Sequence, residues 1–146
     1  MKTIRYAVFT LITLCIAPFA LADGHAGDLT LKPRQPETTM EITSIHFGED
    51  RTSISAQGDM GAYGKVYASY ALSYDATGNS GPVRASGRGF AEGQTASGYA
   101  HCVWHRDGQK VVMQIVVMMN DGSQKLEEII TDPMTNTMTI HTYALK

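Results

Sequence analysis

Residues 98–119, GYAHCVWHRDGQKVVMQIVVMM, predict a β-hairpin and with it the fold class of the chain. Asp107-Gly108 stands between two β-prone runs, and Asp-Gly at the centre of a two-residue type I′ turn is the strongest short-range hairpin signal. With that turn, Trp104 faces Val111 across the hairpin. One face is then apolar and the other mixed, as in the wall of a β-barrel or β-sandwich.

The two faces of this hairpin differ in chemistry. The apolar face carries Ala100, Cys102, Trp104, Met113 and Ile115. The mixed face carries His101, Val103, His105, Val112 and Gln114. Histidines four residues apart on a strand have Cα atoms about 13 Å apart. The sequence therefore predicts no compact metal site at His101 and His105.

Short β-prone runs separated by Gly, Asn and Asp continue along the chain. The longest, residues 62–75, alternates with a period of two and places Tyr70 on the same face as Val66 and Leu72. Gly87 and Gly89 lie inside another run and are typical of a bulge or of sharp coiling. The expected strands lie within residues 40–46, 52–57, 62–75, 83–91, 98–119 (two strands), 124–131 and 137–145. We expect an all-β, eight-stranded antiparallel up-and-down barrel, with a β-sandwich as the alternative.

The N-terminal residues resemble a secretory signal peptide. Lys2 and Arg5 precede an apolar run, and residues 20–22, ALA, fit the small-x-small cleavage rule. We therefore expect a signal peptide at 1–22, a flexible leader at 23–38 and a barrel domain at 39–146. The predicted location is periplasmic or secreted.

The net charge and the number of cysteines limit which partners and which disulfides the protein can have. Without residues 1–22 the chain has 10 Lys and Arg against 14 Asp and Glu, a net charge of −4. We expect no nucleic-acid partner and no membrane insertion after signal cleavage. Nucleic acids and anionic membranes bind proteins with clustered positive charge, and this chain is net negative. Cys102 is the only cysteine left, so no intramolecular disulfide can form, and we expect its thiol to be buried in the core.

A carboxylate on the inner face is the first candidate for chemistry. If Asp121-Gly122 forms a second two-residue turn, Val117 pairs with Leu126 and Glu128 joins the apolar face. A carboxylate there has a raised pKa and can act as an acid or base, or hold a polar ligand group. A loop one residue longer reverses the parity, leaving Glu128 in solvent and Glu127 inside.

The inner face also supplies the candidate ligand-binding residues. They are Trp104, Cys102, Tyr70, Met113, Ile115 and Glu128. Glu128 and Tyr70 are the catalytic candidates if the protein is an enzyme. The alternative for Tyr70 is a structural tyrosine whose hydroxyl binds the backbone.

Several segments together resemble the allene oxide cyclase and dirigent-type barrels of the lipocalin-like group. They are GKVYASYALSYD, SGRGF, GYAHCVWHRDG and the strand ending in TYAL, within roughly the last hundred residues. The resemblance implies a lumen for an apolar small molecule, sometimes with a cyclisation or coupling inside it. No catalytic residue can be matched to those families.

Three functions remain open at this point. The first is an exported, non-enzymatic barrel that binds a small hydrophobic molecule, without a cofactor. The second is a cyclase or isomerase that uses Glu128 and Tyr70. The third is a filled barrel that acts as an interaction or envelope-stress module through outer residues such as His101, Gln114 and Tyr99.

The predicted new N-terminus resembles an amino-terminal copper and nickel motif. Cleavage after Ala22 exposes Asp23-Gly24-His25. The α-amine, two backbone amides and the His25 imidazole can form a square plane of nitrogens, which suits Cu(II) or Ni(II). The alternative is a histidine that stands third by chance and has no role.

Overall fold

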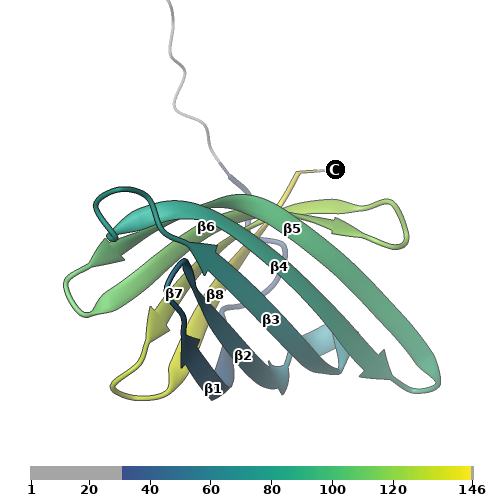
Figure 1. Ribbon diagram of the computed structural model, residues 1–146. Helices are drawn as coiled ribbons and strands as arrows, with labels where there is room; N and C mark the ends of the chain where they lie inside the picture. The colour runs from purple at the N-terminus through teal and green to yellow at the C-terminus, as the bar shows by residue number, and fades with distance from the viewer. Residues whose placement is uncertain (1–30, 146) are drawn as a thin grey trace, which may run out of the picture.

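A computed structural model describes residues 31–145, which form a closed barrel of eight antiparallel strands in up-and-down order (Figure 1). The predicted fold class is confirmed. The predicted signal peptide and His25 lie outside the described residues. The elements are β1 (Thr38–Phe47), β2 (Arg51–Asp59), the 3-10 helix η1 (Gly61–Tyr63), β3 (Lys65–Ser73), β4 (Ser80–Ala91), β5 (Gln94–Asp107), β6 (Lys110–Met119), β7 (Gln124–Asp132) and β8 (Thr137–Ala144).

Each strand pairs with the next one in sequence, and β8 closes the barrel onto β1. This closure is short, since only Thr38–Glu41 of β1 pairs with β8. A register shift between Ile42 and Ser44 marks a bulge in β1, beyond which β1 pairs only with β2. The bulge bends the strand at the point where it leaves β8. Gly87 and Gly89, by contrast, lie in ladders without a register shift, so neither marks a bulge.

The β5–β6 hairpin forms with a different turn from the one expected. Asp107 pairs directly with Lys110, so Gly108 and Gln109 are the central residues. Gly108 has φ 59°, and Gln109 is not among the residues with positive φ, which is the φ pattern of a type II′ turn. Trp104 consequently pairs with Met113. The predicted pairing was wrong by two residues, and a shift of two leaves every side chain on its predicted face.

The β6–β7 hairpin decides which glutamate enters the barrel. The Met119 amide donates to the Ser123 carbonyl at 3.0 Å, which leaves a three-residue loop that ends at Gly122, with φ 82°. Val117 then pairs with Lys125. The interior placement of Glu128 was wrong, because the longer loop reverses the parity of β7.

Glu127 takes the interior position that was considered for Glu128. It is 6% exposed, while Glu128 on the other face of β7 is only partly buried. The alternative with the longer loop is therefore confirmed.

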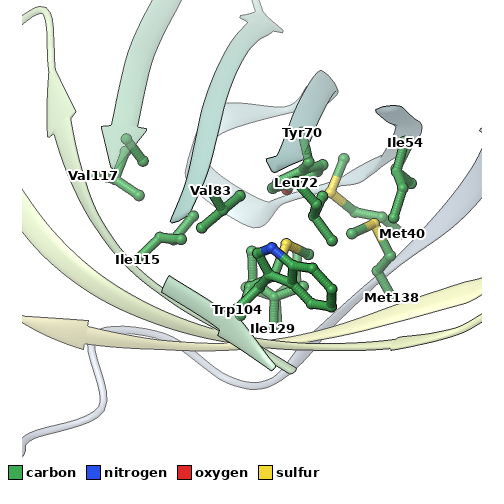
Figure 2. Packing of buried hydrophobic residues seen from close by; sticks show 14 of the residues in the cluster. Met40, Ile54, Tyr70, Leu72, Val83, Trp104, Ile115, Val117, Ile129 and Met138 are labelled. Carbon is green, nitrogen blue, oxygen red and sulfur yellow. The ribbon is translucent and has the colours of Figure 1, made fainter. Parts of the chain in front are cut away.

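Apolar side chains from all eight strands pack inside the barrel (Figure 2). Trp104 is 2% exposed, and its indole N–H donates to the Ser73 carbonyl at 2.8 Å. The edge of the Tyr74 ring packs against it, with 6.1 Å between ring centroids. The largest fully buried side chains include Met40, Leu72, Met113, Ile115, Ile129, Met138 and Ile140. The half of the barrel around Leu72, Trp104 and Met113 is filled, whereas Met40, Ile115 and Ile140 border a cavity.

Cys102 departs from the predicted pattern. It is a free, exposed cysteine, although Ala100 and Trp104 on the same strand are buried. β5 is the longest strand, and long barrel strands must coil. Along it the alternation is interrupted, since His101, Cys102 and Val103 are all exposed. The prediction of a buried thiol was wrong because that prediction assumed unbroken alternation.

The segment before β1 lies along β8. Pro33 forms an isolated bridge with Tyr143, and the Arg34 amide donates to the Thr142 carbonyl at 2.8 Å. The Ala144 amide donates in return to the Lys32 carbonyl at 3.1 Å. Within residues 31–145 no helix is long and apolar enough to cross a membrane.

Candidate functional site

The end of the barrel near η1 has walls of small residues and contains a partly open cavity of about 70 Å³. Its small lining residues on β3, β4 and β5 include Ala68, Ala85, Gly87, Gly89, Ala96, Gly98 and Ala100. Several of these are direct partners, because Gly87 pairs with both Ala68 and Gly98. The cavity therefore lies where three neighbouring strands lack side chains long enough to fill the interior.

The three glycines that line the cavity, Gly87, Gly89 and Gly98, differ in how much space a Cβ atom would have. A Cβ on Gly89 would lie 2.5 Å from the Tyr63 carbonyl oxygen, so η1 requires glycine there. A Cβ on Gly98 would lie 2.9 Å from the Met119 sulfur. A Cβ on Gly87 meets nothing closer than 3.4 Å, which is ordinary contact. Packing therefore explains Gly89 and Gly98 but leaves Gly87 with room for a side chain.

A buried ion pair lines the same cavity. On β7, the Lys125 Nζ lies 2.8 Å from the Glu127 Oε1, and the two side chains are 5% and 7% exposed. The Lys125 ammonium also lies 4.5 Å from the centre of the Tyr63 ring. Buried charges persist in proteins when they are paired, and the aromatic face adds a favourable contact for the cation. Together these groups form a charged region in an interior whose other buried side chains are mainly apolar.

Two further hydroxyl groups belong to this region. Tyr70 is 4% exposed and lines the cavity. Burial, and next the negative charge of Glu127, raise the pKa of Tyr70 above its usual value, so its hydroxyl stays protonated and can donate. Within residues 31–145 no hydrogen-bond partner satisfies the buried Thr142 hydroxyl, and Thr142 pairs with Glu127 across the strands.

The structure places only some of the six predicted ligand-binding residues at the cavity. Tyr70 and Ile115 line the cavity. Trp104 and Met113 are buried, but in the filled half of the barrel. Cys102 is exposed on β5.

Glu128 points away from the interior, so it does not converge with Tyr70 on the cavity. Lys125 was not predicted as a site residue, and Glu127 was predicted to lie inside only as an alternative to Glu128. The signal that could have found both is Asn120-Asp121-Gly122, because a glycine ending a three-residue hairpin loop is also common.

The described part of the chain contains no cluster of side chains that could bind a metal ion. No group of three or more His, Cys, Asp or Glu residues is placed to hold an ion there. His101 and His105 are both exposed on the outer face of β5.

Comparison with known proteins adds no relative. No protein-family model matches the chain, and no match was found among curated proteins or solved structures.

Proposed function

We propose that the barrel binds a small molecule, without chemical reaction, in the cavity at its η1 end. The observation that carries this proposal is the room beside Gly87, where neither packing nor backbone conformation requires glycine. A glycine inside a strand weakens it, so an unfilled position in the core has a cost that a bound ligand offsets.

The lining indicates the chemistry of the ligand. Lys125 and Glu127 neutralise one another, so the pair favours a neutral ligand over a charged one. The Tyr70 hydroxyl can donate a hydrogen bond, and the carboxylate of Glu127 can accept one. An alcohol, ketone or phenol with an apolar remainder fits this combination.

The size of the cavity limits the enclosed part of the ligand. About 70 Å³ is half of the roughly 150 Å³ of an engineered apolar cavity that holds benzene. The cavity therefore accepts a few heavy atoms, or the end of a longer molecule.

Two sequence features support the same proposal. The architecture resembles the allene oxide cyclase and dirigent-type barrels, whose lumens take apolar small molecules. The signal-peptide-like residues 1–22 favour export to the periplasm or beyond. A cyclase or isomerase is less well supported, because Glu128 points outward and Lys125 engages Glu127.

A thermal-shift screen with neutral alcohols, ketones and phenols tests the proposal. At a hundredfold excess over Kd a ligand stabilises the fold by about 2.7 kcal/mol, a rise in Tm of about 10 °C for a domain of this size. Gly87→Val, which fills the cavity, should abolish the rise. Phe47→Ala, at an exposed residue away from the cavity, should retain it. If no compound stabilises the protein, or if Gly87→Val responds like the parent, the proposal fails.

A further inference from the structure

A second hollow lies on the outer surface of the barrel, across β1 to β6, and a row of serines on neighbouring strands is part of its lining. Ser55 pairs with Ser69, and Ser69 pairs with Ser86. Neighbouring strands lie about 4.8 Å apart, so the three residues form an evenly spaced line across three strands. Short side chains in this line make this part of the hollow lower than its surroundings.

Aromatic side chains border this outer trough. Tyr67 lies on one side and contacts Phe90 edge to face, with 6.2 Å between ring centroids. Tyr99 lies at the end of the serine row, where it pairs with Ser86 and donates from its hydroxyl to the Met118 sulfur at 3.8 Å. The three rings are 51%, 50% and 53% exposed, and such a group of exposed rings on one face marks a binding surface.

The charge of the trough is positive. Arg88, the cross-strand partner of Tyr67, lines it, and no carboxylate of the described residues does. Asn120 adds an amide at the far end. The surface thus combines flat apolar rings, closely spaced hydroxyls and one guanidinium.

We propose that this trough binds an extended oligosaccharide. Sugar rings present apolar C–H faces, which stack on aromatic rings, and hydroxyl edges, which need donors and acceptors at short intervals. Each serine hydroxyl offers both roles, and Arg88 adds donors in a fixed plane. Tyr67, Phe90 and Tyr99 supply the stacking faces, and Ser55, Ser69 and Ser86 supply the hydrogen-bonding line.

Other occupants fit the same surface less well. A nucleic acid would need several cations, and one arginine is too few. Protein interfaces are enriched in aromatic residues but depleted in serine, and an apolar partner would leave the serine row unsatisfied. A second copy would bring the same hollow face against itself, and two facing hollows leave a void.

This site adjoins the cavity in the lumen but uses side chains on the opposite face of the barrel wall. The serine row and the aromatic rings point outward, whereas Tyr70, Lys125 and Glu127 point inward. The two hollows share part of their lining, which includes Ser86, Gly87, Arg88, Gly98 and Tyr99. Tyr70→Phe changes a side chain that lines only the lumen cavity and should leave sugar binding unchanged, so the two proposals can fail independently.

Calorimetric titration of the purified protein with hexamers of glucose, N-acetylglucosamine and galacturonic acid tests the proposal. We expect at least one hexamer to bind, and Tyr67→Ala and Tyr99→Ala each to weaken it about tenfold. Phe47→Ala, which removes an aromatic side chain that is 73% exposed and outside the trough, should have no effect. Loss of binding in Arg88→Gln with the acidic hexamer alone would assign the trough to acidic sugars.

Three outcomes would overturn the proposal. One is that none of the three hexamers binds at millimolar concentration. Another is that the double variant of Tyr67 and Tyr99 binds as the parent does. The third is self-association of the parent in sedimentation that Tyr99→Ala abolishes, which would assign the face to a second copy.

Discussion

Two glycines on β4, two residues apart and both facing inward, should respond in opposite ways to an added methyl group. Gly87→Ala should raise the free energy of unfolding by about 0.4–1 kcal/mol, because the methyl finds space and alanine restricts the unfolded chain. Gly89→Ala should lower it by about 1–3 kcal/mol, because its methyl would meet the backbone carbonyl of Tyr63. Denaturant titration measures both, and equal effects would contradict the two environments described for them.

Removing one partner of the ion pair in the lumen should destabilise the protein more than replacing both partners with apolar residues. Lys125→Met should lower the free energy of unfolding by about 3–5 kcal/mol, because it leaves the Glu127 carboxylate buried without its partner. Adding Glu127→Leu should recover most of this loss, since no charge then remains inside.

A matched control is the exposed pair of Lys110 and Asp132, whose charged atoms lie 3.8 Å apart. Lys110→Met should change the free energy of unfolding by less than about 1 kcal/mol. If the double variant at Lys125 and Glu127 is no more stable than the single one, the loss comes from packing and not from an unpaired charge.

At the residue scale, the sequence predicted orientation where alternation is regular. Tyr70, Met113 and Ile115 are buried as expected, because each lies in a strand segment with a clear period of two, and Trp104 is buried although it follows a break in alternation. The exposure of Cys102 was not predictable, because residues 101–103 are all exposed although their ladders with β4 and β6 are regular and the sequence there suggests ordinary alternation.

Among the elements, the β3–β4 loop is expected to respond to pH through Asp75. Hydrogen bonds from the Ser80 hydroxyl and then from the Thr77 hydroxyl lower the pKa of Asp75 from 3.8 to about 2. Because the folded-state pKa is the lower one, the stability from Asp75 is fully present above pH 3.8 and is lost as the pH falls towards 2.

Denaturation midpoints of the parent and of Asp75→Asn, measured between pH 4 and pH 2, test whether Asp75 stabilises the folded state. The parent should lose stability more steeply between pH 4 and pH 2 than the variant does. Parallel curves would show that Asp75 titrates alike in the folded and unfolded chain.

Hairpin turns explain why the strands were easier to predict than their register. Asp-Gly fits a two-residue turn centred on both residues, a turn that begins at the glycine, and a three-residue loop that ends at it. Gly108 belongs to the second kind and Gly122 to the third. The first error left the faces unchanged, and the second decided between Glu127 and Glu128.

For the whole molecule, the number of strands and the lack of helical periodicity sufficed to predict a closed barrel. How far the lumen is filled could not be predicted. It depends on which small residues meet across β3, β4 and β5, as Ala68, Gly87 and Gly98 do. That meeting is set by the register of several hairpins together, and an error of one residue in any of them changes it.

The closure of β1 on β8 is the shortest ladder in the barrel, so a cross-link there should stabilise the whole molecule (Figure 1). Thr39 and Thr139 are direct partners, and paired residues of antiparallel strands lie within the Cα range of a disulfide. Thr39→Cys with Thr139→Cys, made together with Cys102→Ser to remove the exposed thiol, closes a loop of about 100 residues. Chain entropy gives about 4.7 kcal/mol for such a loop, and engineered bridges often deliver less, so we expect about 2–4 kcal/mol.

The reduced form of the same variant serves as the internal control and should match the Cys102→Ser parent in urea titration. A second control is a bridge between Ser55→Cys and Ser69→Cys, also direct partners, which closes a loop of about 15 residues with an entropic limit of about 3 kcal/mol. The bridge at the closure should stabilise more than this local one, because it restricts nearly the whole unfolded chain. If the two cysteines at the closure fail to oxidise within the monomer, β1 and β8 are not held together as described, and the barrel is open at that edge.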